Sequence, residues 1–299
     1  MNRVAKFLAH EGRVSLVCSN TTEMIEEIRK LHDLTPTTTA AMGRFATITG
    51  MMGFTEIKDS EDSITIQLNG KGPMGTLISV VRREMCTSKV KVCVDNPHVE
   101  LPLKQNGKLD VSGAVGTTGF LNIINKNNVT DTNYTGLVPL VTGEIAEDFT
   151  EYFAKSQQKP TVIALGVLVN KDGVESAGGY MIQLMPDATE EDIVKIEKAL
   201  EKAPSISQMI SENKSLEEIA RTVTGDEDVL ILAQELDMKY ECDCNREKFE
   251  AGLISIGKEE LEKIIEEDEK ANIVCNFCKE EYDFNKQDLE ELMNRLENN

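Results

Sequence analysis

CDCNREKFEAGLISIGKEELEKIIEEDEKANIVCNFC, residues 242–278, is the stretch that decides how the C-terminal end of this 299-residue chain folds. A Cys-x-Cys pair begins it, a Cys-x-x-Cys pair ends it, and thirty residues separate Cys244 from Cys275. Two tight cysteine pairs joined by a longer connection are typical of tetrahedral zinc sites, in which four thiolates close the shell of the metal. The sequence therefore predicts one metal ion bound by Cys242, Cys244, Cys275 and Cys278.

The chemistry of these ligands favours Zn²⁺, because soft thiolates select zinc over harder ions; iron is the minor alternative. A closed four-sulfur shell leaves no position for a catalytic water, so we expect no hydrolysis there. The site can be a zinc ribbon that only folds the C-terminus or docks a partner. It can also be a switch, because disulfides formed by an oxidant no longer hold the metal. A thioredoxin-like enzyme is disfavoured, since Cys275–Cys278 does not follow a strand in a βαβ unit.

The composition indicates the compartment and narrows the choice of partners. The first ten residues lack the apolar run of a signal peptide, and no stretch approaches the ~20 apolar residues of a membrane helix. We therefore expect a cytoplasmic protein with reduced thiols and no membrane partner. Residues 181–299 hold 32 acidic and 14 basic residues, a net charge of −18. Because affinity for nucleic acids comes from basic side chains, no nucleic-acid partner is expected.

Residues 1–186 are predicted to form a strand-rich, mixed α/β core domain. The small, apolar segment Thr35–Met52 indicates a buried helix with Pro36 near its start. The apolar run Thr161–Val169 predicts a central strand that forms a hairpin with Gly178–Leu184, or else two strands that are not adjacent. Cys18, Cys86 and Cys93 are expected to be small buried core residues. Further strands are expected at Val14–Cys18, Ser63–Leu68, Thr76–Met85 and Ser88–Val94, and a helix at Thr22–His32.

The rest of the chain is predicted to be a helical linker, residues 187–235, and a small zinc-binding domain, residues 236–299, which is a redox-switch domain if oxidation releases its metal. In the linker, Ser215 and Glu218 match a capping box that begins a helix. The linker has few large apolar residues, so little burial holds it folded. The last domain is marginal for a core of its own, and bound metal would stabilise it. The predicted fold class is therefore α+β in three parts.

The sequence resembles the family of redox-regulated holdase chaperones called heat-shock protein 33. The C-terminal resemblance consists of the two cysteine pairs at their spacing, followed by Tyr282-Asp283-Phe284. In the N-terminal part, TGEIAEDFTEYFAKSQQKPTVIALGVLV, from Thr142 to Val169, is the most specific segment. Shorter segments that also fit are Gly107–Val111, Val115-Gly116 with Gly119, Tyr134-Thr135-Gly136 and Ala177–Pro186. The resemblance extends from about residue 3 to about residue 296.

The resemblance implies an ATP-independent chaperone that responds to oxidative stress. In such a protein the reduced, zinc-bound form is inactive. Oxidation forms the disulfides Cys275–Cys278 and then Cys242–Cys244, releases zinc, and unfolds the switch domain together with the linker. The exposed surface then binds unfolding client proteins and prevents their aggregation. The resemblance also implies a homodimer in the oxidised state.

The alternative hypothesis is a constitutive zinc-ribbon adaptor protein. An adaptor would work with zinc bound and fail once oxidised, whereas the holdase would do the reverse. An enzyme is not expected, because the chain has no Ser-His-Asp arrangement and no phosphate-binding loop of the Walker spacing.

Overall fold

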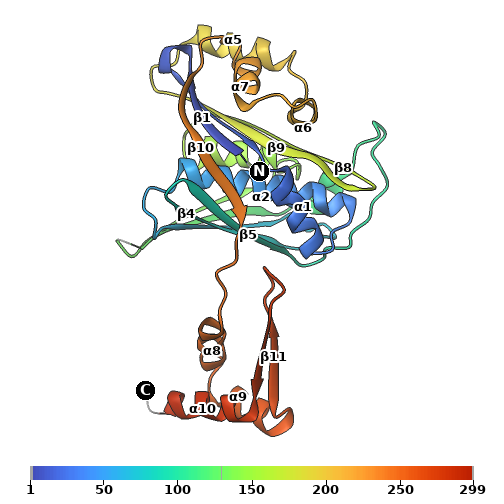
Figure 1. Ribbon diagram of the computed structural model, residues 1–299, viewed down its shortest axis with the longest axis vertical. Coiled ribbons are helices and arrows are strands. Elements are labelled where there is room, and N and C mark those ends of the chain that lie inside the picture. Colours follow the sequence, from blue (N-terminus) through green and yellow to red (C-terminus); the bar gives the residue numbers. More distant parts are fainter. Residues whose placement is uncertain (1–2, 129, 298–299) are drawn as a thin grey trace. The chain divides into compact units, whose positions relative to one another are not determined.

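The computed structural model of the chain describes residues 3–128 and 130–297 and is drawn in Figure 1. Contacts between residues divide the chain into two compact units, one ending at Glu241 and the other beginning at Cys242. Helices and strands occur in both units, so the predicted α+β class is confirmed. Within the described residues, no helix is long and apolar enough to cross a membrane.

Ten described strands of the first unit form one sheet, in the spatial order β7-β6-β3-β4-β5-β10-β1-β2-β9-β8. Neighbouring strands are antiparallel except β5 and β10, which run parallel. The strands are β1 (Arg3–Ala9), β2 (Val14–Asn20), β3 (Ser63–Asn69), β4 (Leu77–Glu84), β5 (Thr87–Val94), β6 (Phe120–Asn127), β7 (Thr132–Pro139), β8 (Thr161–Asn170), β9 (Gly173–Leu184) and β10 (Leu230–Tyr240).

Helices of the first unit lie on both faces of this sheet (Figure 1). They are the 3-10 turn η1 (His10–Gly12) and the helices α1 (Thr22–Leu31), α2 (Pro36–Thr55), α3 (Val111–Val115), α4 (Ala146–Lys155), α5 (Glu190–Leu200), α6 (Ile206–Ser211) and α7 (Leu216–Thr224).

Helix α2 is the element around which the first unit is built. It packs against β8 and β9 as well as β4 and β5, so the curved sheet wraps around it (Figure 1). Almost all of its residues are buried, which confirms the helix predicted from Thr35–Met52. Small residues let the strands approach closely: a Cβ at Gly50 would clash with the side chain of Met238 in β10.

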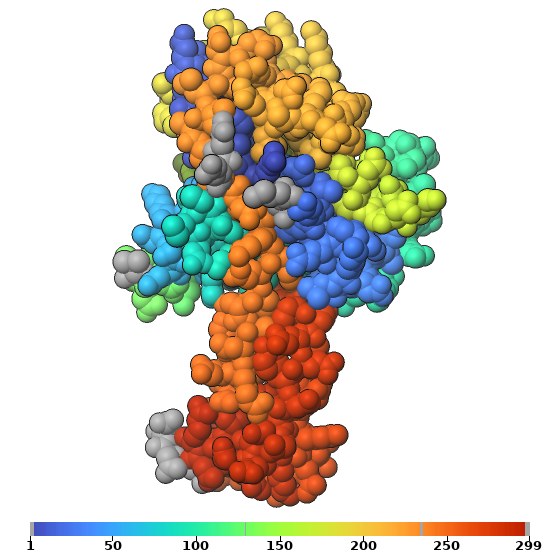
Figure 2. Space-filling view, in the orientation of Figure 1, coloured from blue at the N-terminus to red at the C-terminus, as the bar shows by residue number. Residues whose placement is uncertain are grey.

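Helices α5, α6 and α7 cover the other face of β1, β2 and β9. A second apolar cluster forms there; its buried members include Phe7, Leu16, Tyr180, Ile182, Ile196, Met209, Ile219 and Val223. In Figure 2 these helices, in yellow and orange, make a continuous surface at the top of the view. We call residues 187–229, which hold these three helices, the connector.

The second unit is small and has few buried apolar side chains. It contains α8 (Arg246–Ser255), α9 (Lys258–Glu267), the two-stranded sheet of β11 (Lys270–Val274) and β12 (Glu281–Asn285), and α10 (Lys286–Glu297). Its buried apolar residues are Leu253, Leu261, Phe284, Leu289 and Leu292.

The structure corrects some expectations of position. The run Thr161–Val169 forms β8 and the hairpin with β9 is confirmed, but β8 lies at an edge of the sheet and not at its centre. Residues 230–235, expected in the helical linker, begin β10, which lies between β5 and β1. The three-part division at residues 186 and 235 stays a prediction.

Candidate metal centre

The two cysteine pairs lie at turns next to regular elements of the second unit. Cys242 and Cys244 precede α8, and the side chain of Asn245 caps this helix by accepting from the N–H of Lys248 at 2.9 Å. Cys275 and Cys278 lie in the turn between β11 and β12. This turn is closed from both sides, because Cys275 N–H donates to Glu280 O and Lys279 N–H donates to Cys275 O, each at 2.8 Å.

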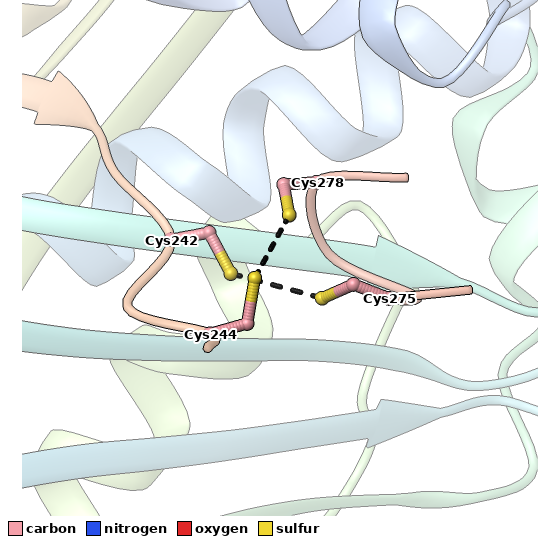
Figure 3. Close-up of side chains that lie close together, drawn as sticks. All are labelled: Cys242, Cys244, Cys275 and Cys278. Carbon is pink, nitrogen blue, oxygen red and sulfur yellow. Dashed lines mark hydrogen bonds between the residues drawn. The ribbon is translucent and has the colours of Figure 1, made fainter. Parts of the chain in front are cut away.

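These turns bring the four sulfurs together, and all of them lie within 4.8 Å of one another. The Sγ atoms of Cys242 and Cys275 are 3.8 Å apart, and those of Cys244 and Cys278 are 3.2 Å apart (Figure 3). A tetrahedral site with metal–sulfur bonds of about 2.3 Å has sulfur–sulfur edges of about 3.8 Å. The four thiols therefore fit the shell of a single metal ion, and among the described residues they form the one such group of His, Cys, Asp and Glu side chains.

The cysteines of the cluster differ in the direction in which their surroundings shift the thiol pKa. Burial raises the pKa of Cys242 to about 11, and burial together with the neighbouring sulfurs raises the pKa of Cys278. Burial also acts to raise the pKa of Cys275, but hydrogen bonds from the backbone N–H groups of Cys278 and Phe277 outweigh it and leave this pKa lowered. Backbone N–H donors stabilise the thiolate form of Cys275, and a bound cation would relieve the repulsion between crowded thiolates.

Two residues near the sulfurs were not predicted as part of the site. The hydroxyl of Tyr282 donates a hydrogen bond to Cys244 Sγ at 3.3 Å. The guanidinium of Arg246 stacks on the ring of Phe284 at 4.2 Å and donates to Asp283 O at 2.7 Å, so it ties the start of α8 to β12. From the sequence, Tyr282 was identified only as part of the motif Tyr282-Asp283-Phe284. Its contact with Cys244 could not be predicted, because that contact depends on the fold.

The remaining cysteines, Cys18, Cys86 and Cys93, belong to the first unit. Cys18 is fully buried as predicted, and burial raises its pKa, which keeps the thiol unreactive. The prediction for Cys86 was wrong: this residue is exposed, in the turn between β4 and β5. Cys93, in β5, is half-buried, so it is not fully a core residue either.

Fold and site together define a protein of two units, in which a large sheet domain is followed by a small unit with four clustered thiols. The sequence profile described as "Hsp33 protein" matches residues 2–285. The chain therefore belongs to the Hsp33 family of chaperones.

Relatives of known name agree with this assignment. The 33 kDa chaperonin of Clostridioides difficile strain 630 is 42% identical over 293 residues, covering 98% of this chain and 99% of that protein. The 33 kDa chaperonin of Bacillus velezensis is 40% identical, covering 98% of each chain. The crystal structure of the 33 kDa chaperonin (heat shock protein 33 homolog) of Thermotoga maritima superposes with a TM-score of 0.88 at 32% identity, covering 100% of this chain and 99% of that one. These names describe a chaperone and no enzyme.

Proposed function

We propose that this chain is a redox-regulated, ATP-independent holdase chaperone. In its reduced form Cys242, Cys244, Cys275 and Cys278 hold one Zn²⁺ ion, and the protein is inactive. The observation that carries this proposal is the convergence of four thiols from two turns in a unit that buries only a few apolar side chains. Zinc would supply the crosslink that such a unit lacks, since structural zinc sites contribute roughly 10–16 kcal/mol of binding energy that is also folding energy.

Oxidation of the thiols is the proposed switch. With hydrogen peroxide as oxidant, a thiolate attacks one peroxide oxygen to give a sulfenic acid and hydroxide. The neighbouring thiol then displaces water and forms the disulfide, and the hydroxide takes up the proton that the first thiol released. Counted from two thiols, each pair loses two electrons and two protons while one peroxide becomes two waters. We propose the pairs Cys275–Cys278 and Cys242–Cys244, because the two cysteines of each pair are close in sequence and the resemblance to the family implies this pairing. Disulfide sulfurs no longer bind the ion, and the second unit loses its crosslink.

The connector is the proposed second part of the switch. Its helices are short and cover an apolar face of β1, β2 and β9. Release of the connector would expose that face to unfolding client proteins, and the acidic C-terminal half would keep the opened protein in solution. We further propose that the oxidised form is a homodimer, that the protein acts in the cytoplasm, and that nucleic acids and membranes are not its partners.

Two measurements on one sample distinguish the holdase from its alternative, the constitutive zinc-ribbon adaptor. Reduced, zinc-loaded protein is treated with peroxide under mild heat. A chromogenic chelator follows the zinc that leaves, and light scattering follows a client that aggregates on heating. We expect zinc release and suppression of aggregation to appear together, and both to reverse when a reductant and zinc are added. Zinc release without protection of the client would refute the holdase and favour the adaptor.

A further inference from the structure

Tyr282 connects the two halves of the sulfur cluster. It lies in β12, the strand that follows Cys275 and Cys278, and it is paired there with Ile273 of β11. Its hydroxyl nevertheless donates to Cys244 Sγ, at 3.3 Å, in the other cysteine pair. The side chain therefore spans from the hairpin with one cysteine pair to a sulfur of the other.

The direction of this hydroxyl is fixed by packing. The ring of Tyr282 stacks against Phe249 of α8, with ring centroids 4.6 Å apart and planes 38° apart. Phe249 and Cys244 belong to the same segment, because α8 begins two residues after Cys244. The sulfur of Cys244 and the ring of Phe249 are therefore close together in one segment, and both orient the phenol of Tyr282.

The other neighbours of Cys244 Sγ increase the negative charge around it. The Cys278 sulfur lies at 3.2 Å and the Glu280 carboxylate oxygen Oε2 at 3.9 Å. A phenolic O–H that donates to a thiolate withdraws electron density from the sulfur. A sulfur with less electron density attacks peroxide more slowly. The same hydrogen bond also holds the sulfur in a defined direction toward a bound metal.

We propose that Tyr282 is a positioning residue that sets the oxidation threshold of the four-sulfur site by restraining the Cys244 thiolate. This inference rests on the proposed redox switch, whose regulation it specifies. Its first consequence concerns kinetics: without the hydroxyl, Cys244 reacts with peroxide earlier and the metal leaves sooner. Its second consequence concerns the electronic state of the sulfur, which does not depend on chaperone activity.

Replacing Tyr282 by phenylalanine removes the hydroxyl and keeps the ring on Phe249. We expect Y282F to release zinc under peroxide about tenfold faster than the unaltered chain, which is the lower end of what one hydrogen bond to a charged group contributes. Mass spectrometry of trapped thiols should show Cys244 oxidised earlier. In the Co²⁺-loaded protein, the sulfur-to-cobalt charge-transfer band should move to longer wavelength, because the more electron-rich sulfur gives up an electron more easily.

Two control variants separate the hydrogen bond from looser packing. Tyr134→Phe removes a hydroxyl that donates to Ser156 O at 3.2 Å in the first unit, and should change neither readout. Phe249→Leu loosens the ring stack that orients the hydroxyl but keeps the hydroxyl itself, so its cobalt band should move less than that of Y282F. Equal release rates and an unshifted band in Y282F would overturn the inference. The inference would also be overturned if F249L and Y282F released zinc equally fast and the cobalt band moved in neither variant.

The outcome also distinguishes this inference from the proposed function. If the unaltered chain keeps its zinc under peroxide, the redox switch fails, and the cobalt band alone still decides whether Tyr282 acts on Cys244. If the unaltered chain releases zinc and Y282F behaves identically in both readouts, the switch stands and the role of Tyr282 is wrong.

Discussion

At the scale of single residues, Cys275 and Cys278 are where the proposed switch can be disabled most directly. Replacing both by serine removes two of four thiolates and the disulfide that they would form, while hydroxyls of similar size remain in the turn. We expect this double variant to bind zinc too weakly to be gated, and to show the same client protection with and without peroxide. Cys86→Ser, an exposed cysteine of the first unit, is the matched control and should switch normally. A double variant that still switched with oxidant would show that the four sulfurs are not the sensor.

Asp192, at the start of α5, ties the connector to the turn between β1 and β2. Its carboxylate, 1% exposed, accepts from Arg13 Nε at 2.8 Å and Nη2 at 3.0 Å, and lies 3.0 Å from Nδ1 of His10. These hydrogen bonds, that of Arg13 foremost, hold the pKa of Asp192 well below its usual range. A depressed carboxyl pKa stabilises the folded state above the unfolded pKa of about 3.9, and this stabilisation is lost as the pH falls below that value.

We expect Asp192→Asn to destabilise the connector by about 2–3 kcal/mol, because the Arg13 guanidinium loses its buried charged partner and keeps only the exposed Glu11. Hydrogen exchange of α5 and α7 in the reduced protein measures this. In the unaltered chain, protection from this ion pair should persist from pH 7 down to about 4 and decline below. Glu191→Gln, at an exposed carboxylate paired with Lys195, is the control and should change little. Unchanged exchange in D192N would mean that the apolar cluster alone holds the connector.

The sequence predicted the four clustered cysteines, because their spacing is local information. It did not predict the contact of Tyr282 with Cys244, which depends on where chain segments distant in sequence come to lie. It also missed the exposure of Cys86, which lies in the two-residue turn between β4 and β5. Residue type alone favours burial for cysteine, yet Cys86 follows Met85 in a tight turn and extends into solvent.

At the scale of elements, α2 and β8 show that an apolar run predicts an element but not its place in the fold. The sequence predicted a helix and a strand at these two runs, and α2 is buried as predicted. The prediction that β8 is central was wrong because helices can bury an edge strand: α2 and α4 pack on β8, and α6 contacts it as well. Strand β10 was missed because Leu230–Tyr240 mixes apolar and charged residues, and its neighbours β5 and β1 are far away in sequence.

The cap of α7 gives a prediction for one connector helix. The Ser215 hydroxyl accepts from Glu218 N–H at 3.2 Å, and Glu218 Oε2 accepts from Ser215 N–H at 2.7 Å, as the predicted capping box requires. Ser215→Ala should destabilise α7 by about 1 kcal/mol and lower the temperature at which peroxide activates the protein. Ser215→Asp keeps a capping acceptor and should behave like the original residue. Equal activation temperatures for the alanine and aspartate variants would argue against α7 as part of the switch.

At the scale of the whole molecule, the two units differ in what holds them together. The first has two large apolar clusters, one around α2 and one beneath the connector. The part of the second unit that the structure describes has one small apolar cluster with five buried members, and this unit carries part of the strong negative charge of the C-terminal half. A core of this size is marginal without a crosslink, so the metal and the fold of the second unit should be lost together.

Removing the metal without oxidant tests this difference directly. Adding a strong chelator to the reduced protein should abolish the protection of α9 and α10 against hydrogen exchange, because the small apolar cluster of this unit is marginal once roughly 10–16 kcal/mol of metal binding is lost. The strands β1 to β9 should stay protected, since their core does not include the cysteines of the site. Chelator already saturated with Zn²⁺ is the control and should leave both units folded. A second unit that kept its protection after the metal had left would mean that disulfide formation, and not loss of the ion, is what opens the protein.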